Sequence, residues 1–377
     1  MIVPKYGLVG GAEGYVAETT SRLSNNSYQF HVFANKWLQD EKIRFHKVPI
    51  LSFPRFLISI SFAFYAGKKM HRETAIKPFD LVHTHDRVFN ADLFTMHSIP
   101  HWMWVKEVRQ KRMSLFDLGT SWVEQLLVKK GKCLFTAVSS LSKEKFLHAY
   151  PEIDGNKVYV IHPGIDPMVY RDLDKEHCRA EIRRNYNIDQ SDFVILFVSM
   201  NFDIKGLDFL LHGLARLRYQ KPDTSWKLLI AGKDDNPKFG RLAQKLKIRD
   251  RVIFAGVIDR CVLKKIYLAS DLFAMPSRFD TFGLTVLEAM AAGLPAVVSC
   301  NVGAKDVIKP GQNGFVIKNT DRPEEIAQAI LTTLDNSVRE KMRDASLKTA
   351  IDFTWDRTAR KTRDLYETIL KTKQTSA

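Results

Sequence analysis

The sequence predicts an α/β protein with two doubly wound domains that face each other across a cleft. Short apolar runs rich in Val, Ile and Phe alternate with segments of helical period along most of the 377 residues. These runs do not alternate apolar with polar residues, as expected for parallel strands buried on both faces. The series ends at the turn formed by Pro163 and Gly164 and then starts again, which predicts two parallel sheets.

The first domain is predicted to span residues 1–161. Its first strand is short, because only Met1, Ile2 and Val3 precede Pro4. Further strands are predicted at Tyr28–Ala34, Asp80–His83, Cys133–Val138 and Lys157–Ile161.

The second domain is predicted to span residues 162–352. Its strands are predicted at Val194–Ser199, Trp226–Ala231, Arg251–Phe254, Leu272–Met275 and Ala296–Val298. The intervening helices include Gly206–Leu217, Phe239–Leu246, Leu284–Ala292 and Pro323–Leu334.

The net charge of the chain restricts the kind of binding partner that we expect. The 57 Lys and Arg against 42 Asp and Glu give a net charge of +15, which implies a polyanionic partner such as nucleic acid, a phosphorylated glycan or an anionic lipid surface. The four cysteines have no paired spacing, which argues against a disulfide framework or a cysteine zinc site and suits a reducing cytoplasm. The most apolar stretch, Phe56 to Ala66, is shorter than the roughly 20 residues that span a bilayer.

Two glycine-containing turns are candidate anion sites. Gly10 and Gly11 follow the first strand, where small residues let the backbone approach an anion; a tight turn is the alternative interpretation. Lys205 precedes Gly206 at a strand-to-helix turn, where its ammonium group and the helix dipole could meet a phosphate. A solvated lysine is the alternative at that position.

The most informative segment joins two carboxylates. Asp280 lies in a loop, and Glu288 follows eight residues later on the helix that comes next. Between them Phe282, Gly283 and Leu284 are predicted to present free backbone amides at the start of that helix. The segment therefore predicts a site for a phosphate-bearing ligand that is rich in hydroxyl groups.

In this order the segments resemble the retaining, metal-independent GT-B glycosyltransferases of family 4, also called group 1, and among them the lipopolysaccharide-core glycosyltransferases. The resemblance runs nearly end to end and implies two Rossmann-like domains. It rests on the segments Gly10–Glu13, Asp80–Asp86, Lys205–Gly206, Asp280 with Glu288, Val252–Gly256, Ala291–Pro295 and Phe353–Trp355.

The resemblance implies roles for the second domain, which would bind the nucleotide sugar. Lys205 would bind the donor diphosphate, Asp280 the hydroxyls of the transferred sugar, and Glu288 the ribose hydroxyls. The amides of Phe282, Gly283 and Leu284 would stabilise the leaving diphosphate. The residues that would lie against the base are Val257 and Ile258.

It also implies roles for the first domain, which would take the acceptor. Gly10 and Gly11 would form a loop facing the donor phosphate and the acceptor, and His97 would lie near the reacting centre. Trp355 would begin a C-terminal helix, within residues 353–377, that packs back on this domain.

Two residues depart from the family pattern. Asp280 stands where many relatives have Glu, so its carboxylate is one methylene shorter. Met200 stands where many relatives place an arginine that shares the diphosphate charge. Because Lys205 and the helix-start amides would stabilise the leaving group, we expect neither a metal nor a cofactor besides the nucleotide-sugar co-substrate.

Residues 100–116 mix interfacial aromatic residues with basic ones, a composition typical of a segment on an anionic membrane. The residues expected to contact membrane or acceptor are Trp102, Trp104, Lys106, Arg109, Lys111 and Arg112. The alternative is an amphipathic helix packed on its own domain. Residues 51–66, by contrast, are apolar on all faces, which predicts a buried helix.

These observations predict a retaining hexosyltransferase, peripheral on the cytoplasmic face of the membrane. It would move a hexose from a nucleotide-diphosphate sugar, a UDP-sugar such as UDP-glucose being favoured, to a lipid-linked glycan such as lipopolysaccharide core. One alternative is a soluble glycosyltransferase with a small acceptor. Another is a basic nucleic-acid-binding protein, although the chain has no recognised nucleic-acid module and we expect no nucleic-acid partner.

Overall fold

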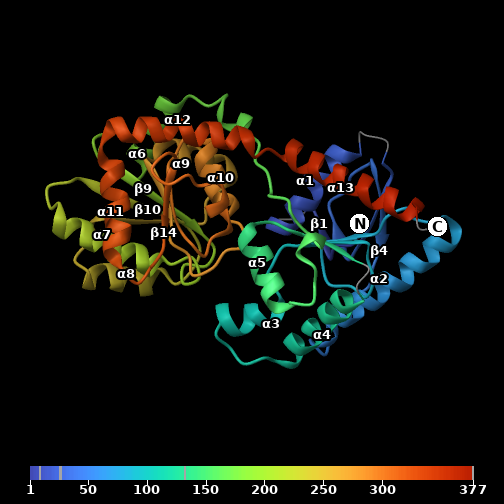
Figure 1. Ribbon diagram of the computed structural model, residues 1–377. Coiled ribbons are helices and arrows are strands. Elements are labelled where there is room, and N and C mark those ends of the chain that lie inside the picture. The colour runs from blue at the N-terminus through green and yellow to red at the C-terminus, as the bar shows by residue number, and fades with distance from the viewer. Residues whose placement is uncertain (8–9, 25–27, 131–132, 376–377) are drawn as a thin grey trace. The chain divides into compact units, whose positions relative to one another are not determined.

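The computed structural model describes residues 1–7, 10–24, 28–130 and 133–375. The chain divides into two compact units (Figure 1). Unit 1 comprises Met1–Pro163 and Trp355–Ala377, and unit 2 comprises Gly164–Thr354. Each unit holds a parallel sheet covered by helices, which confirms the predicted α/β class with two doubly wound domains.

The main sheet of unit 1 is joined at its centre by a single residue. Ile2 forms parallel bridges to Phe33 and Thr84, so the predicted first strand is reduced to that bridge between two groups of strands. The groups are β2–β4 and β5–β6–β7–β8. Their bounds are β2 Phe30–Ala34, β4 Ile43–Lys47, β5 His83–Thr84, β6 Leu93–Met96, β7 Leu134–Ala137 and β8 Val158–Val160. Two further strands, β1 Lys5–Tyr6 and β3 Lys36–Trp37, pair separately.

The helices of unit 1 include one from the end of the chain. Their bounds are α1 Gly11–Leu23, α2 Leu57–Ile76, α3 His101–Met103, a π-helix Trp104–Val108, α4 Leu115–Lys129, α5 Ser140–Ala149, a 3-10 turn Gly155–Lys157 and α13 Trp355–Thr375. The Tyr366 hydroxyl of α13 lies 2.6 Å from His83 Nδ1, and Lys373 forms a 2.8 Å ion pair with Asp92. The C-terminal helix is therefore fixed to the same sheet as the N-terminus.

Unit 2 has a six-stranded sheet in the order β11–β10–β9–β12–β13–β14. The strands are β9 Phe193–Ser199, β10 Trp226–Gly232, β11 Val252–Gly256, β12 Leu272–Met275, β13 Ala296–Ser299 and β14 Gly314–Ile317. The chain winds outward in both directions from β9 and β12. In such sheets ligands bind at the carboxyl ends of the strands where the winding reverses, so the β9–β12 boundary is the expected position of a site.

The helices of unit 2 cover both faces of this sheet (Figure 1). They are α6 Lys175–Asn185, α7 Leu207–Gln220, α8 Asn236–Lys245, α9 Arg260–Ala269, α10 Leu284–Ala291, α11 Pro323–Leu334 and α12 Asn336–Asp352. Three 3-10 turns are Pro167–Tyr170, Arg249–Arg251 and Gly303–Val307.

One predicted strand is largely replaced by loop. Residues 80–82 of the Asp80–His83 prediction are not in a strand. The backbone N–H of Val82 donates instead to the Asp92 carboxylate at 2.7 Å. A side chain thus takes the hydrogen bond that a neighbouring strand would have made, and the strand begins only at His83.

The prediction that residues 51–66 are a buried helix is wrong for part of that segment. Helix α2 begins only at Leu57, and it buries Phe62, Ala63 and Ala66. Phe53 is 87% exposed and Phe64 is also exposed. Among the described residues, no helix combines the length and the hydropathy needed to cross a membrane.

A buried arginine fixes the amino ends of β9 and β12. The side chain of Arg183 is fully buried and donates to Asp271 Oδ2 at 2.9 Å, and Asp271 Oδ2 also accepts from the backbone N–H of Val194 at 2.8 Å. Arg183 also donates to the carbonyls of Asp189 and Asp192 at 2.7 and 2.8 Å. These bonds hold together the two strands whose opposite ends carry the expected site.

We therefore expect Arg183→Leu to lower the free energy of unfolding by about 3 kcal/mol, because the substitution leaves buried carbonyls without their donor and removes one cationic donor from the Asp271 carboxylate. Calorimetry on unit 2 within the full chain measures this loss. The exposed neighbour Arg184 provides the matched control, Arg184→Leu, for which little change is expected. Equal losses in the two variants would contradict the structural role given to Arg183.

Candidate functional site

The turn after β9 lies directly against the loop after β12. Gly206 caps the start of α7 with φ of +73°, and a Cβ atom there would lie 2.1 Å from the carbonyl oxygen of Pro276. Only glycine fits both the backbone conformation and this close approach. The backbone N–H of Arg278 donates to the carbonyl of Ile204 at 2.8 Å, so the two loops are also bonded together.

This approach brings two of the predicted site residues into contact. Lys205 Nζ donates to Asp280 Oδ2 in an ion pair whose side chains are 23% and 16% exposed. The lysine and the carboxylate therefore lie at the β9–β12 boundary, where the winding of the sheet reverses. Because their charges cancel, the pair as it stands offers an anion no net charge.

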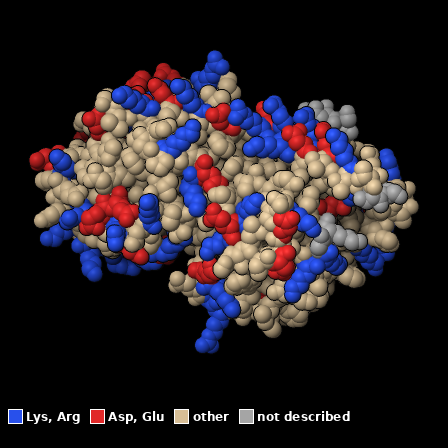
Figure 2. All heavy atoms as spheres, in the orientation of Figure 1, with Lys and Arg blue, Asp and Glu red and all other residues tan. Residues whose placement is uncertain are grey.

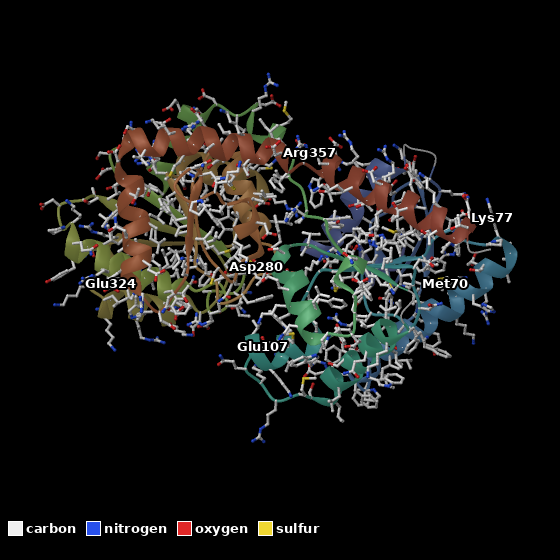
Figure 3. All side chains as sticks on the ribbon, in the orientation of Figure 1. Met70, Lys77, Glu107, Asp280, Glu324 and Arg357 are labelled. Carbon is white, nitrogen blue, oxygen red and sulfur yellow. The ribbon has the colours of Figure 1, made fainter. Side chains whose placement is uncertain are left out.

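The loop that carries Asp280 is held from both sides. The Asp280 N–H donates to the Asn301 carbonyl at 3.0 Å, and the Gly303 N–H donates to the Asp280 carbonyl at 2.9 Å. These backbone bonds fix the carboxylate in front of the start of α10. Asp280 is labelled in Figure 3.

The predicted row of free amides is shorter than expected. The N–H of Phe282 donates to Asp280 Oδ1 at 3.2 Å, so the description of this amide as free is wrong. Gly283 caps α10 with φ of +95°, and Leu284 is the first residue of the helix. The positive end of α10 therefore faces the Asp280 carboxylate, which an N-terminal helix dipole favours.

Glu288 lies one to two turns further along α10. Its Oε2 accepts a 2.9 Å hydrogen bond from the hydroxyl of Tyr267 on α9, and burial raises the pKa of its carboxyl group. Among the described residues, no hydrogen bond joins Glu288 to Lys205 or Asp280. The two predicted acids thus occupy separate positions on one element, one at a helix start and one deeper along it.

Val257 and Ile258 follow β11 at the carboxyl end of the sheet, and Val257 is exposed. The helix α9 begins two residues later at Arg260 and carries Tyr267, the partner of Glu288. The predicted base-binding residues are therefore connected to the second acid through one helix.

Sequence reasoning missed Arg278, two residues before Asp280. Its guanidinium binds both oxygens of Asp208 at 2.8 and 2.6 Å, and it lies 4.0 Å from the ring centroid of Phe209. It also donates to the Asp203 carbonyl at 2.7 Å. Arg278 thus joins the loop that carries Asp280 to the turn that carries Lys205. Its position in the same loop as Asp280 is the sequence feature that could have identified it.

In unit 1, Gly10 and Gly11 lie at the start of α1, and both are exposed. The N–H of Gly14 donates to the carbonyl of Gly10 at 3.0 Å, which begins the helix there. Residues 8 and 9, which directly precede Gly10, lie outside the described residues.

His97 follows β6 and belongs to a row of aromatic rings. Its Nε2 lies 2.9 Å from His85 Nδ1, and the Tyr15 ring packs edge-on at 5.0 Å between centroids. Tyr15 is in turn 5.7 Å from the ring of Trp355 at the start of α13. His97 and Trp355 were predicted from the sequence, whereas Tyr15 and His85 were not, although His85 lies in the segment Asp80–Asp86.

Burial determines the charge of these histidines. It lowers the pKa of His97 to about 4 and the pKa of His85 well below its usual value. Both rings are therefore neutral at pH 7, and the bond between them uses one nitrogen of each. His97 keeps Nδ1 for a further hydrogen bond.

The predicted membrane segment is not one amphipathic helix. Helix α3 is three residues long, a five-residue π-helix follows, and residues 109–114 are not helical. Trp102 and Trp104 are half-buried, whereas the four basic residues Lys106, Arg109, Lys111 and Arg112 are exposed. Glu107, labelled in Figure 3, pairs with Lys145 at 2.8 Å.

The exposed apolar side chains of unit 1 gather on the next helix instead. Leu115, Leu118 and Trp122 of α4 are 70%, 52% and 49% exposed. Helix α4 packs on α2 through a 2.9 Å hydrogen bond between Ser59 and Thr120. The exposed apolar residues of both helices therefore belong to one pair of packed elements.

Charge does not gather in a single patch on the visible face. Figure 2 shows Lys and Arg spread over both units, with Asp and Glu among them. Among the described residues, no group of three or more His, Cys, Asp or Glu side chains is placed to hold a metal ion.

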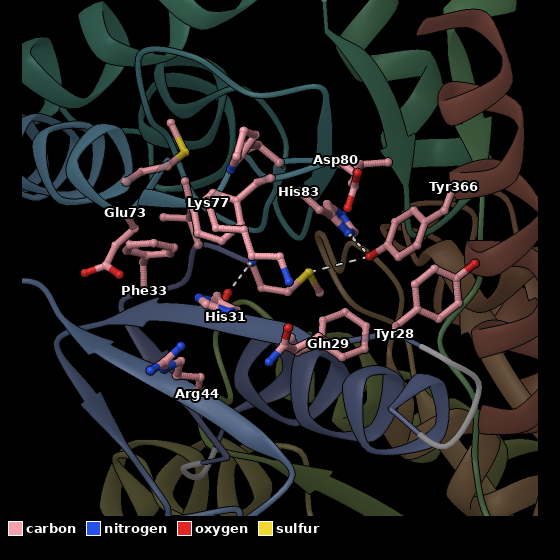
Figure 4. Close-up of a pocket in the computed structure, with 18 of the residues that line it drawn as sticks. Tyr28, Gln29, His31, Phe33, Arg44, Glu73, Lys77, Asp80, His83 and Tyr366 are labelled. Carbon is pink, nitrogen blue, oxygen red and sulfur yellow. Dashed lines mark hydrogen bonds between the residues drawn. The ribbon is translucent and has the colours of Figure 1, made fainter. Parts of the chain in front are cut away.

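A cavity of about 640 Å³ lies elsewhere in unit 1 (Figure 4). His31, Arg44 and His83, on three strands, line it, and His83 bonds there to Tyr366 of α13. His83 is the first residue of its strand and His31 the second of its own, so the cavity lies at the amino ends of strands. It contains none of the predicted site residues, and ligands of parallel sheets bind at the opposite ends.

Two family models match the chain. The model described as Glycosyltransferase Family 4 matches residues 9–168, and the model described as Glycosyl transferases group 1 matches residues 179–349. Together the two models match most of the chain; the first lies mainly in unit 1 and the second lies in unit 2.

Relatives match at low identity. An uncharacterized glycosyltransferase of Methanocaldococcus jannaschii is 27% identical over 340 residues, which cover 86% of this chain and 84% of that protein. A D-inositol 3-phosphate glycosyltransferase of Stackebrandtia nassauensis is 27% identical over 388 residues, 94% of this chain and 86% of that protein. Relatives with the same name from Nocardioides and Jonesia denitrificans are matched over only 53% and 58% of their length.

Solved structures share the fold. WaaG, a glycosyltransferase involved in lipopolysaccharide biosynthesis, has a TM-score of 0.76 at 20% identity, covering 97% of this chain and 98% of that one. Anabaena Alr3699/HepE in complex with UDP-glucose has a TM-score of 0.70 at 17% identity, covering 97% and 98%. At these identities both show that the fold is that of the GT-B glycosyltransferases.

The lowered pKa of His97 predicts a pH effect on stability. In the unfolded chain His97 binds a proton below its ordinary pKa of about 6.5, whereas the folded protein takes it up only near 4. Stability from this residue is therefore lost as the pH falls between these values, by about 2 kcal/mol from pH 7 to pH 5.

Urea denaturation at the two pH values, on the parent and on His97→Asn, measures this contribution. The parent should lose about 2 kcal/mol more than the variant over that interval. The same loss in both proteins would show that His97 is not held neutral by its surroundings.

Proposed function

This chain is a glycosyltransferase with a family 4-like domain and a group 1 domain, and we propose that it is a retaining hexosyltransferase. The proposed donor is a nucleotide-diphosphate sugar, with UDP-sugars favoured because a protein of the same fold has been solved with UDP-glucose. The proposed acceptor is a lipid-linked glycan such as lipopolysaccharide core.

The observation that carries the donor proposal is the Lys205–Asp280 pair in front of α10. In the proposed complex, Lys205 exchanges the Asp280 carboxylate for a donor phosphate oxygen. Asp280 is then free to accept hydrogen bonds from hydroxyls of the transferred sugar. The amides of Gly283 and Leu284 add donors for the leaving diphosphate, whose negative charge grows as the glycosidic bond breaks.

The rest of unit 2 supports recognition of the nucleoside. A carboxylate such as Glu288, oriented by Tyr267, can accept hydrogen bonds from both ribose hydroxyls. Val257 and Ile258 offer an apolar contact for the base. No charged group is required beside the base, which leaves its identity to backbone contacts.

In unit 1, the neutral His97 is proposed to hydrogen-bond a sugar or acceptor hydroxyl through Nδ1, with Gly10 and Gly11 giving the acceptor close access to the backbone.

Retention is proposed to proceed by attack on the face from which the diphosphate leaves, a departing phosphate oxygen taking the acceptor proton. We propose that no metal takes part, because Lys205 and the helix-start amides would help to stabilise the leaving diphosphate.

For membrane contact we propose the same basic residues as before, but the apolar residues of α4 in place of Trp102 and Trp104. Leu115, Leu118 and Trp122 are exposed on α4, close in sequence to the exposed cations Lys111 and Arg112. Exposed apolar side chains beside basic residues suit the interface of an anionic membrane. We propose that this face of unit 1 holds the enzyme on the cytoplasmic surface of the membrane, near its lipid-linked acceptor.

A second candidate is transfer to a small soluble acceptor. Several relatives bear the name D-inositol 3-phosphate glycosyltransferase, and one of them matches 94% of this chain. In that case the basic residues of unit 1 would serve a phosphorylated acceptor and the protein would not need a membrane.

The donor proposal is tested by thermal shift with UDP, GDP and ADP and with their hexoses. A nucleotide at 100 times its Kd should stabilise the protein by about 2.7 kcal/mol, and UDP compounds should do so at the lowest concentration. Lys205→Ala and Glu288→Ala should lose most of the shift, and chelation of divalent ions should leave it unchanged in the parent. Lys245→Ala, a surface lysine at the end of α8, is the matched control.

If no nucleoside diphosphate or nucleotide sugar stabilises the parent protein, the donor proposal fails. If chelation removes the shift, the proposed metal independence fails while the donor proposal stands.

The membrane proposal is tested by sedimentation with vesicles of phosphatidylglycerol and phosphatidylcholine. The double variant Leu115→Ser and Leu118→Ser should bind anionic vesicles at least about fivefold more weakly, since burying such side chains stabilises binding. Ile351→Ser, at an exposed apolar residue of unit 2, should bind as the parent does. If the parent protein does not bind vesicles but transfers sugar to a soluble acceptor, the second candidate is favoured.

A further inference from the structure

A diphosphate needs more positive charge than the Lys205–Asp280 pair supplies. The pair has no net charge, and a nucleotide sugar carries more than one negative charge on its diphosphate. Met200, directly after β9, stands where the resemblance to family 4 implies an arginine, and its side chain is exposed and uncharged. Another cation at this edge of the sheet would therefore complete the site.

The register of the sheet places Lys233 beside that position. Gly232, the last residue of β10, pairs in parallel register with Ser199, the last residue of β9. Lys233 and Met200 are therefore the first residues beyond the ends of two neighbouring strands, whose paired backbones lie about 5 Å apart.

The loop after Lys233 is fixed to the loop after Met200. The N–H of Phe202 donates to Asp234 Oδ2 at 2.5 Å, and a Cβ atom at Gly232 would meet the Ser199 carbonyl at 1.6 Å. The backbone on both sides of Lys233 is thus held against the backbone around Met200.

The charged neighbours of Lys233 already have partners. Lys238 pairs with Asp203, and the Asp234 carboxylate binds the N–H groups of Phe202 and Asp235. Lys233 is exposed and forms no hydrogen bond or ion pair with any residue that the structure describes. It is a free cation beside a position that lacks one.

We infer that Lys233 supplies the second positive charge for the diphosphate, in place of the arginine that Met200 replaces. The long, flexible side chain of lysine lets an ammonium group from the end of β10 reach an anion in front of β9. The inference rests on the proposed nucleotide-diphosphate donor, and it adds a residue from a loop to which no role has been given. With Lys233 included, residues of three loops, those after β9, β10 and β12, would contact the diphosphate.

Binding of UDP and UMP, measured by calorimetry at one fixed low salt concentration, tests this role. Lys233→Ala should weaken UDP binding about tenfold, or about 1.4 kcal/mol, and UMP binding less than twofold, because UMP lacks the second phosphate. Lys245→Ala should bind both nucleotides as the parent does.

A rescue variant gives the sharper result. Met200→Arg in the Lys233→Ala background should restore UDP binding to within about threefold of the parent, because it returns a cation to the neighbouring strand end. Thermal melting of each variant without nucleotide checks that it is folded.

Three results would overturn the inference. If the parent binds UDP and Lys233→Ala binds it equally well, Lys233 has no such role and the donor proposal stands. If Lys233→Ala weakens UDP and UMP equally, its effect is not on the second phosphate. If the parent binds no nucleoside diphosphate, the donor proposal fails and the inference fails with it.

Discussion

The close approach of Gly206 to the Pro276 carbonyl is the constraint on which the candidate donor site depends. It requires a residue without a Cβ atom and with positive φ at the start of α7. Because of it, the turn after β9 touches the loop after β12, and Lys205 meets Asp280. Arg278 adds side-chain bonds between the same two loops. A larger residue at position 206 would separate the lysine from the carboxylate without altering either one.

The ion pair that results explains how an anion site can be stable without its ligand. A buried or half-buried lysine ammonium group with no counter-charge destabilises the folded protein. The Asp280 carboxylate supplies that counter-charge until a phosphate replaces it. The same neutrality creates the need for further positive charge, which the start of α10 and the free cation Lys233 can meet. Polar bonds at the far end of the sheet, around Arg183 and Asp271, keep β9 and β12 together so that these groups stay in place.

The sequence was sufficient for the features that depend on local pattern. Each buried parallel strand is a short run of neighbouring residues, and the fold class could be predicted from these runs. The acidic pair Asp280 and Glu288 could be recognised because its two residues lie only eight positions apart. Contacts between distant segments could not be predicted from the sequence: the pairing of Arg278 with Asp208 depends on how the loop after β12 meets the start of α7. Exposure was also inaccessible, because an apolar run such as residues 51–66 does not reveal which of its faces another helix covers.

A crystal structure of the protein with UDP tests most directly whether Lys205 exchanges Asp280 for a donor phosphate. We expect UDP on unit 2, with Lys205 Nζ within hydrogen-bonding distance of a phosphate oxygen and no longer bonded to Asp280. The ribose hydroxyls should contact Glu288. UDP bound on unit 2 with the Lys205–Asp280 pair intact, or bound at some other place, would contradict this exchange.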